Sequence, residues 1–264
     1  MKYGIEWCDE DMMIPKIGKK ILRGEKGLMV ILSKSPVAKV KWKANRCNSI
    51  EDFVNLAFNP SSAFPLPWIS ISPSQVKEEI TELVKILARR KPKLVLEVGT
   101  ARGGTLFLFA RVSGPEAVII SIDLPGGQFG GGYPEWRVPL YKSFAIQNQK
   151  INLIRGNSHD FSTLEMVEKV LEGRRLDFLF IDGDHTYDGV KKDFQMYSDL
   201  AGKGGIIAFH DIVPGPPESV GGVPRFWSEI KHSFNYVELV KNWKQGRCGI
   251  GVIYCDKDGG RRCD

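Results

Sequence analysis

Between residues 75 and 211 the chain alternates between two patterns of apolar positions. Short runs that are apolar almost throughout are separated by longer stretches in which apolar residues recur every three or four positions. The first pattern is typical of strands covered on both faces of a sheet, and the second of amphipathic helices. Their alternation predicts a doubly wound α/β fold with a largely parallel sheet. The expected strands are 93–99, 117–123, 151–156, 176–182 and 204–211, and the expected helices lie near 103–113, 141–149, 161–172 and 186–200.

The flanking segments predict one helix before this alternation and a hairpin after it. Ser72, Pro73 and Gln75 have the spacing of an N-cap, a first-turn proline and a capping-box residue, so the first helix is expected to begin at Ser72. Near the end, the stretch "VPRFWSEIKHSF" has a helical pattern, and two closely spaced strands follow it within 236–256. Such a pair adds a hairpin with one antiparallel strand to the sheet edge, which makes about seven strands in all.

These patterns divide the chain into four segments. Residues 1–58 have no long helical period and are expected to form a basic N-terminal extension, irregular or with small strands. Residues 59–74 are rich in proline and serine with aromatic residues between them, which is typical of an ordered flap or linker. The α/β domain is expected at 75–256, followed by a loose tail at 257–264.

Composition restricts the class of protein. Of the 264 residues, 42% are apolar and 26% charged, which is ordinary for a globular protein in water. No apolar run reaches the ~20 residues of a membrane-spanning helix, and the acidic start is unlike a secretory signal. Five cysteines without a C-x-x-C pair favour reduced thiols. A cytoplasmic location without a membrane span is therefore expected.

The net charge of +6 is concentrated near the N-terminus. Residues 1–50 contain eleven Lys and Arg against five Asp and Glu, and 39–46 is the densest basic stretch. One interpretation is a surface for nucleic acid, anionic lipid or an acidic glycan, and the other is a solvated strand or arm. The charge pattern by itself does not separate these interpretations.

Polar residues and glycines follow each of the five predicted strands. In an open parallel sheet, ligands bind beyond the carboxyl ends of the strands. Gly99 and Gly103 frame a tight turn after the first strand, and this turn is neither the dinucleotide fingerprint nor a P-loop. Asp123 lies 24 residues after Gly99 at the end of the second strand, where a carboxylate can accept hydrogen bonds from both ribose hydroxyls. Together these residues predict a nucleoside-containing cofactor.

The stretch "LVLEVGTARGGT" resembles motif I of the class I S-adenosylmethionine-dependent methyltransferases, in which an acid, one residue, a glycine, three residues and a glycine follow one another. The resemblance extends from about Pro73 to Tyr254 and implies a Rossmann-like methyltransferase sheet whose last strand is antiparallel. It implies S-adenosylmethionine as the cofactor, with Asp123 at the ribose, Asn157 and Ser158 near the adenine, and the first turn at the methionine portion. The expected cofactor-binding residues are Gln75, Glu97, Gly99, Thr100, Ala101, Gly103, Asp123, Leu124, Asn157, Ser158 and Asp182.

Carboxylates and an imidazole crowd the end of the fourth strand in the stretch "DGDHTYD". Here the chain resembles the metal-dependent sugar and macrolide O-methyltransferases and the cephalosporin-hydroxylase-type group, in which an Asp ends this strand and a His base follows three residues later. The resemblance implies Asp182 and His185 as catalytic residues. It also implies Mg²⁺ or Mn²⁺ at Asp182, His210 and Asp211, although the family has two acids where this chain has His210-Asp211. A role of His210 as a second base or a substrate contact stays open.

Other polar residues near these strand ends have simpler expectations. Asp188 and Asp193 are expected on the surface, and His159 is expected to be incidental to the site. The glycine-rich stretch 123–144 should lie over the site as a lid or carbohydrate platform, or serve as a dimerisation arm. The expected acceptor contacts are Tyr133, Trp136 and Tyr187.

The expected function is methylation of a hydroxyl on a saccharide or glycosylated small molecule. Three alternatives stay open: a non-catalytic protein that binds a nucleoside cofactor, a dinucleotide oxidoreductase, and an RNA-directed methyltransferase recruited by the basic N-terminus. The fourth strand lacks the Asn/Asp-Pro-Pro-aromatic motif of amino-group methyltransferases, which disfavours N-methylation of a base. Nucleic acid is therefore not the expected partner. Whether the chain forms a homo-oligomer is also left open.

Overall fold

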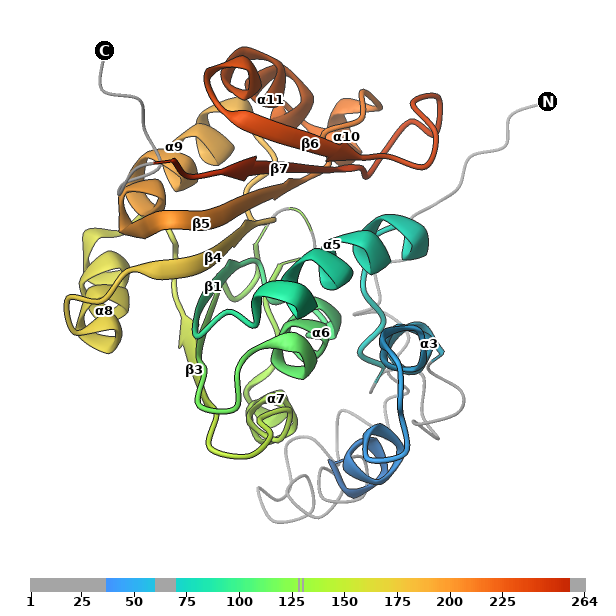
Figure 1. Ribbon diagram of the computed structural model, residues 1–264. Helices are drawn as coiled ribbons and strands as arrows, with labels where there is room; N and C mark the ends of the chain where they lie inside the picture. Colours follow the sequence, from blue (N-terminus) through green and yellow to red (C-terminus); the bar gives the residue numbers. More distant parts are fainter. Residues whose placement is uncertain (1–36, 60–69, 128, 130, 257–264) are drawn as a thin grey trace, which may run out of the picture.

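The computed structural model describes residues 37–59, 70–127, 129 and 131–256. Within these ranges seven strands form one sheet in the order β3-β2-β1-β4-β5-β7-β6 (Figure 1). The first five strands pair in parallel, and β7 runs antiparallel to both of its neighbours. The predicted doubly wound sheet with an antiparallel last strand is confirmed. The strands are β1 (Leu94–Val98), β2 (Val118–Asp123), β3 (Lys150–Arg155), β4 (Leu176–Ile181), β5 (Ala201–His210), β6 (Asn235–Leu239) and β7 (Ile250–Tyr254).

Helices cover both faces of the sheet (Figure 1). Because side chains alternate along a strand, Val95 joins the hydrophobic cluster on one face, while Leu94 and Leu96 join the cluster on the other. This explains why the strands are apolar almost throughout. The first face is covered by α3 (Ile50–Phe58), α5 (Lys77–Arg90), α6 (Gly104–Val112) and α7 (Val138–Lys142), and the second by α8 (Phe161–Leu171), α9 (Tyr187–Tyr197) and α11 (Val223–Ile230). Short turns of helix complete the fold at η3 (Glu135–Arg137), η4 (Ser198–Leu200), α10 (Pro217–Val220) and η5 (Lys231–Ser233).

The strand order reverses at β1, whose neighbours are β2 and β4. At such a switch point the connecting segments leave in opposite directions, and a crevice opens beyond the carboxyl ends of the strands. The turn after β1 and the stretch after β4 both border this crevice. The fold therefore brings the two motifs found in the sequence to one place.

The start of α5 differs from the prediction. The helix begins at Lys77 with Val76 as its N-cap, and no side chain caps it. The expected capping box at Ser72 and Gln75 is wrong because residues 72–76 run non-helically toward the sheet edge, where Gln75 bonds to Asp182. The helix expected near 141–149 is also displaced: α7 ends at Lys142, and Pro139 lies in its first turn.

The N-terminal segment is helical where the structure describes it. Residues 37–44 form a helix, and α3 follows with a capping box at Ser49. The expectation of irregular or small-stranded structure is wrong over this range, because Val40 and Ala44, four residues apart, lie buried on one helical face. Most of the segment expected as a flap at 59–74, the first 36 residues and the tail at 257–264 lie outside the described residues.

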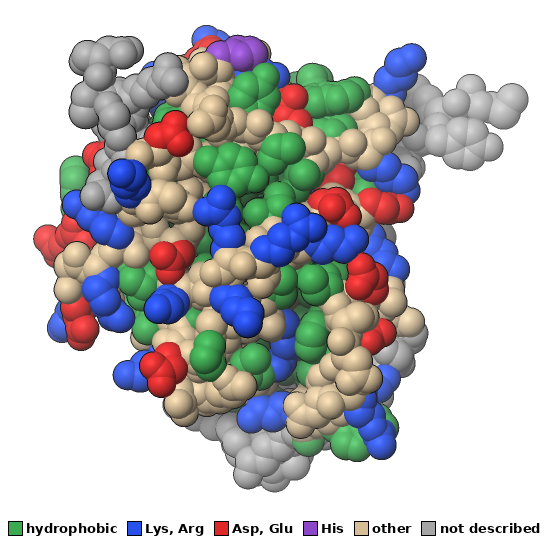
Figure 2. Space-filling model, viewed as in Figure 1, with side chains coloured by type: hydrophobic (Ala, Val, Ile, Leu, Met, Phe, Trp, Pro, Cys, Tyr) green, Lys and Arg blue, Asp and Glu red, His purple; other side chains and the backbone are tan. Residues whose placement is uncertain are grey.

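Charged side chains of both signs are interspersed on the face shown in Figure 2. Among the coloured residues of that view, no large area carries charge of a single sign. In the described ranges, none of the helices combines the length and the apolar composition that crossing a membrane would need.

Candidate active site

The turn after β1 has a backbone that only glycine tolerates. Gly99 has a φ of +98°, and a Cβ there would lie 1.9 Å from the carbonyl oxygen of Asp182. Gly103 has a φ of +79°, and its Cβ would lie 2.6 Å from the ring of Tyr141. The two glycines of motif I thus let the turn approach β4 on one side and an aromatic ring on the other.

Tyr141 and Arg137 fix the turn after β1 through hydrogen bonds. The Tyr141 hydroxyl donates to the carbonyl of Ala101 at 2.8 Å, and Arg137 donates to that hydroxyl at 3.3 Å and to the carbonyl of Ser70 at 3.0 Å. Both side chains are buried. Ala101 itself has a φ of +41°, an unusual conformation for alanine that these contacts maintain.

Two buried carboxylates lie on the β1–β2 side of the crevice. Asp123 accepts hydrogen bonds from the backbone N–H groups of Ala101 at 2.5 Å and Gly132 at 2.6 Å. Glu97 accepts one from the Ser121 hydroxyl at 2.5 Å. Burial raises the pKa of Glu97 to about 8, and burial also raises the pKa of Asp123 against the opposing effect of its backbone donors.

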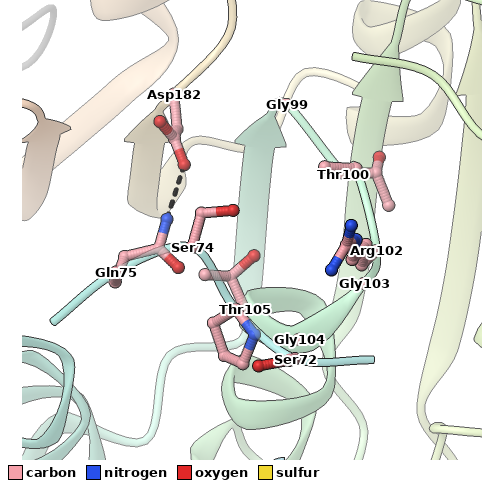
Figure 3. A pocket seen from close by; sticks show the side chains of 12 residues that line it. Ser72, Ser74, Gln75, Gly99, Thr100, Arg102, Gly103, Gly104, Thr105 and Asp182 are labelled. Atoms are coloured by element: carbon pink, nitrogen blue, oxygen red, sulfur yellow. Dashed lines mark hydrogen bonds between the residues drawn. The ribbon is translucent and has the colours of Figure 1, made fainter. Parts of the chain in front are cut away.

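A narrow cavity connects this turn to the end of β4 (Figure 3). Its volume is about 20 Å³, and Asp182 lines it opposite the turn. Gln75 donates to Asp182 Oδ2 across a distance of 2.7 Å between nitrogen and oxygen. The cavity is also lined by Ser72, Pro73 and Ser74 and by the residues from Gly99 to Thr105.

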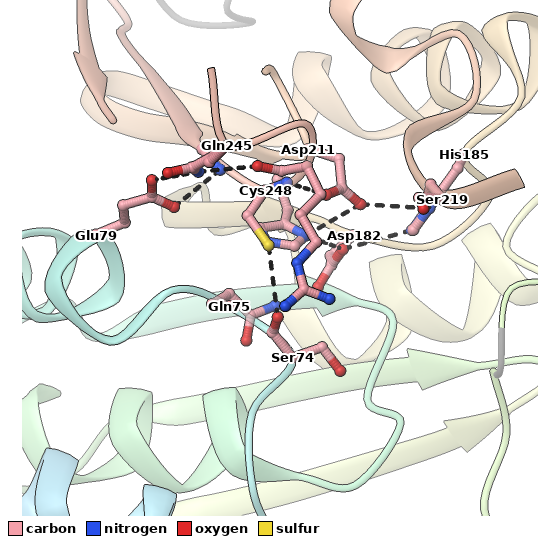
Figure 4. Close-up of polar contacts among 12 residues, drawn as sticks. Ser74, Gln75, Glu79, Asp182, His185, Asp211, Ser219, Gln245 and Cys248 are labelled. Atoms are coloured by element: carbon pink, nitrogen blue, oxygen red, sulfur yellow. Dashed lines mark hydrogen bonds and ion pairs between the residues drawn. The ribbon is translucent and has the colours of Figure 1, made fainter. Parts of the chain in front are cut away.

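Two aspartates and two histidines form a compact cluster at the ends of β4 and β5, and Figure 4 shows Asp182, His185 and Asp211 of this cluster. His210 Nδ1 lies 3.0 Å from Asp182 Oδ1 and 3.3 Å from Asp211 Oδ2. His185 Nδ1 lies 3.3 Å from Asp211 Oδ2, and its Nε2 lies 3.7 Å from Asp182 Oδ1. Each imidazole therefore contacts both carboxylates. The structure brings Asp182, His185, His210 and Asp211 together, and their catalytic and metal-binding roles stay predictions.

The charges in this cluster stabilise one another. Burial tends to raise the pKa of Asp182, but the charges of His210 and His185 outweigh it and bring the value to about 2. Burial tends to lower the pKa of His210, yet the two carboxylates raise it well above the ordinary range. For His185 the effect of burial is likewise outweighed, mainly by the contact with Asp182, and its pKa is raised.

The loop before β7 supports the cluster, and the sequence analysis missed it. The backbone N–H of Cys248 donates to Asp211 Oδ1 at 2.8 Å, while its thiol donates to the Ser74 carbonyl at 3.7 Å. Asp211 has a φ of +61°, a strained conformation that this bond helps to maintain. Glu79 on α5 accepts from the N–H of Gly249 at 2.8 Å and so fixes the same loop. The position of Glu79 among the apolar residues of α5 is the one signal in the sequence that could have revealed this support.

The glycine-rich stretch after β2 reaches the cluster. The ring of Phe129 stacks on His185 with 4.6 Å between centroids, and Gly132 binds Asp123. The Nδ1 atom of His185 lies 2.7 Å from the carbonyl oxygen of Ser219, in the segment after β5. Segments after β2 and β5 thus form two walls of the site.

The remaining predicted residues lie in different surroundings. Tyr133 is buried, with its ring edge against Tyr141 at 4.9 Å, and Trp136 is half-buried beside Arg137. Tyr187 donates to Glu229 at 2.6 Å on the outer side of α9. Within the described part of the chain, none of these three predicted acceptor contacts forms a hydrogen bond with the four-residue cluster.

Asn157 and Ser158 follow β3, and the surface position expected for Asp193, which contacts the neighbouring His159, is wrong. Asn157 accepts from the N–H of His159, and the Ser158 carbonyl accepts from Tyr197 at 2.6 Å. Asp193 is fully buried rather than on the surface, and it lies 3.2 Å from His159 Nε2. The error arose because Asp193 follows two lysines on a helix, which is the pattern of an exposed face. Thr100, beside Ser121 at 2.6 Å, is buried, and Leu124 is exposed.

Comparison with known proteins agrees with this geometry. Residues 96–212 match the family model of a methyltransferase domain. The chain is 32% identical over 116 residues to the uncharacterized protein R132 of Acanthamoeba polyphaga mimivirus, a match that covers 44% of this chain and spans half the length of that relative.

Solved structures share the fold at low identity. The O-methyltransferase TomG from Streptomyces achromogenes, involved in tomaymycin synthesis and bound to S-adenosylmethionine, has a TM-score of 0.53 at 15% identity, covering 83% of this chain and 96% of its own. An O-methyltransferase from Bacillus cereus in complex with S-adenosylhomocysteine has a TM-score of 0.53 at 17% identity, covering 84% and 99%. The chain thus has the class I methyltransferase fold, and residues 96–212 are similar to a methyltransferase domain.

Proposed function

We propose that this methyltransferase domain transfers a methyl group from S-adenosylmethionine to a hydroxyl group, with Asp182 joining the cofactor site to an acid–base cluster. The position of Asp182 carries the proposal. On one side it lines the cavity formed by the motif I turn, and on the other it contacts His185 and His210. The methyl donor and the proton acceptor would therefore both lie beside the Asp182 side chain. An in-line transfer to a hydroxyl requires such proximity.

Residues around the cavity fit the cofactor. Gln75 is 6% exposed, and its Oε1 has no hydrogen-bond partner among the described residues. A buried acceptor of this kind needs a donor, which the ammonium group of S-adenosylmethionine would provide. Each oxygen of Asp123 accepts one backbone N–H and keeps a second lone pair for a ribose hydroxyl. A cavity of about 20 Å³ holds little more than one water, so residues 72–75 or the stretch after β2 must shift as the cofactor enters.

His185 is the proposed base. A carbonyl oxygen only accepts, so the 2.7 Å contact with Ser219 places a hydrogen on His185 Nδ1 and leaves Nε2 free to take a proton. In the transfer, the acceptor oxygen bonds to the methyl carbon, the carbon–sulfur bond breaks, and the hydroxyl proton passes to Nε2. Asp182 and Asp211 stabilise the imidazolium that results.

The same cluster is the proposed site of a divalent cation. The proposed ligands are Asp182, His210 and Asp211, and His210 Nδ1 lies 3.0 Å from Asp182 Oδ1 and 3.3 Å from Asp211 Oδ2. His210 Nε2 is buried and has no hydrogen-bond partner in the described part of the chain. Mixed imidazole and carboxylate donors suit Mn²⁺ better than Mg²⁺, which prefers oxygen ligands. When bound, such a cation would lower the pKa of the acceptor hydroxyl.

A hydroxyl of a saccharide or a glycosylated small molecule is the proposed acceptor. The Phe129 ring beside His185 offers a planar surface next to the base. The carboxylates around it can accept hydrogen bonds from neighbouring hydroxyl groups of the same molecule. The densest basic stretch of the N-terminus, 39–46, lies on the helix at 37–44 and the turn after it rather than in the cluster.

Calorimetric titration tests the proposal. S-adenosylmethionine and S-adenosylhomocysteine are titrated into the full chain with Mn²⁺ and with a chelator, with NAD as a control. Micromolar binding of both sulfur nucleosides is expected, weaker in Asp182→Asn and unchanged in the exposed-site control Asp188→Asn. Glycans are then screened for release of S-adenosylhomocysteine. Binding of NAD without either sulfur nucleoside would contradict the proposal.

A further inference from the structure

A second cavity, of about 340 Å³, lies between the N-terminal helix and the last turn of α6. Gly104 at the first turn of α6 lines the cofactor cavity, and Arg111 at its last turn lines this one. Seven residues of helix separate them by roughly 10 Å along the axis. The polar residues that line the second cavity are Lys41, Asn45, Arg111, Ser143 and Gln147, and no carboxylate is among them.

Arg111 is a partly buried cation without an anion. In the described part of the chain it forms no ion pair, and its buried Nε has no hydrogen-bond partner. Its guanidinium lies 4.8 Å from the ring of Phe107 and 6.0 Å from that of Phe53. Burial lowers its pKa to about 10, so the group stays charged at neutral pH. The negative end of α6 compensates only a fraction of this charge, and an uncompensated charge in such surroundings is costly.

We propose that this cavity binds a small phosphorylated molecule whose phosphate group contacts Arg111 and Lys41. A guanidinium held against an aromatic ring presents its N–H groups in a fixed fork, which matches two phosphate oxygens. The cavity is larger than one phosphate group, and Asn45, Ser143 and Gln147 offer hydrogen-bonding groups to a hydroxylated body. The site is separate from methyl transfer and would act on it only through α6.

The phosphate group is a feature that small metabolites share with nucleic acids. Nucleic-acid surfaces present an extended basic stripe that follows the backbone. Here Lys41 and Arg111 line the same pocket, which favours a small ligand. Lys39 lies on the same helix as Lys41 but is exposed and does not line the cavity, so it provides a matched control.

Calorimetry of the full chain with glucose 6-phosphate, inorganic phosphate, glucose and a single-stranded RNA oligonucleotide tests this inference. Glucose 6-phosphate is expected to bind more tightly than inorganic phosphate, and glucose to show no binding. Arg111→Met and Lys41→Gln should weaken the binding of glucose 6-phosphate by about 10- to 100-fold, whereas Lys39→Gln should leave it unchanged. Without ligand, Arg111→Met should melt no lower than the parent protein, because it removes an uncompensated cation.

Two results would overturn the inference. One is an affinity for glucose 6-phosphate that is absent or unaffected by Arg111→Met. The other is tighter binding of the RNA than of any small phosphate, with equal losses in Lys39→Gln and Lys41→Gln, which would assign the basic helix to nucleic acid. S-adenosylhomocysteine binding, measured in parallel, shows whether the cofactor proposal stands independently.

Discussion

Glu97 and Asp123, on the β1–β2 side of the crevice, have the same chemistry as Asp182 on the β4 side, but their protonation differs. The first two accept hydrogen bonds from neutral hydroxyl and backbone groups, and their pKa values are raised. Asp182 contacts two imidazoles, and its pKa is lowered to about 2. Neutral donors do not offset the cost of burying a charge, whereas cations do. In the proposed reaction, the β1–β2 side would hold the cofactor and the β4–β5 side would take up the proton.

Gly99→Ala should have the largest effect on this arrangement, because Gly99 lies where the turn after β1 meets the end of β4. The new methyl group would collide with the Asp182 carbonyl, and the φ of +98° disfavours alanine. We expect a loss of about 3 kcal/mol or more in the free energy of unfolding and no binding of S-adenosylhomocysteine. Urea unfolding and calorimetry measure both.

Gly126→Ala is the matched control. Gly126 has a φ of +79° but no atom within 4 Å of its Cβ position, so only the backbone penalty of about 1 kcal/mol applies. Equal losses in the two variants would show that conformation, not the close approach to β4, makes Gly99 necessary.

His185→Gln should lower turnover without changing the binding of the cofactor product. Turnover is expected to fall by about 10²- to 10⁴-fold, because the proton acceptor is lost. The dissociation constant of S-adenosylhomocysteine should change little, since His185 does not line the cofactor cavity. His232→Gln on η5 is the control for a histidine outside the cluster. A variant that lost cofactor binding and turnover in parallel would contradict the division.

The pH dependence of turnover should report the β4–β5 side. The carboxylates raise the pKa of His185 above 6.5, and the base must be neutral to accept a proton. Turnover should therefore fall as the pH drops through a midpoint above 6.5, with the midpoint belonging to the coupled histidines rather than to one residue. Asp182→Asn removes the contact that raises this pKa, so in the residual activity the midpoint should move downward. A midpoint that stays in place would argue against the contact with Asp182.

Glu97→Gln should give the smallest effect and report the β1–β2 side. The pKa of Glu97 is about 8 in the fold against 4.5 ordinarily, so the folded state keeps a proton that the unfolded state releases between these values. Stability of the parent protein should fall as the pH rises through this window, whereas glutamine cannot ionise. The melting temperature of the variant relative to the parent should thus rise from pH 5 to pH 8. The exposed-site variant Glu116→Gln should show no such trend.

The sequence predicted the sheet and the residues at its ligand edge because both depend on local pattern. Apolar runs gave β1 to β5 within a few residues, and the carboxyl ends of parallel strands must share one edge. Asp182 and His210 could therefore be placed together from the sequence. The pairing of each imidazole with both carboxylates could not, because it depends on side-chain directions.

Other features depend on contacts that are remote in sequence. Ser72 and Gln75 have the spacing of a helix cap, but the hydrogen bond from Gln75 to Asp182, 107 residues away, outweighs local preference. Asp193 has an exposed pattern and is buried beside His159. Cys248 gave no signal, because its role at Asp211 comes from its backbone N–H, which every residue except proline has.

β7 is the last strand of the sheet in the chain, yet it lies inside the sheet with β5 on one side and β6 on the other. Until residues 248–254 have been made, β6 has no partner among the described strands, Asp211 lacks the donor supplied by Cys248, and Glu79 lacks the donor supplied by Gly249. Translation makes these residues after every other element of the described structure. A growing chain would form the turn after β1 early but could not complete the four-residue cluster until β7 had been made.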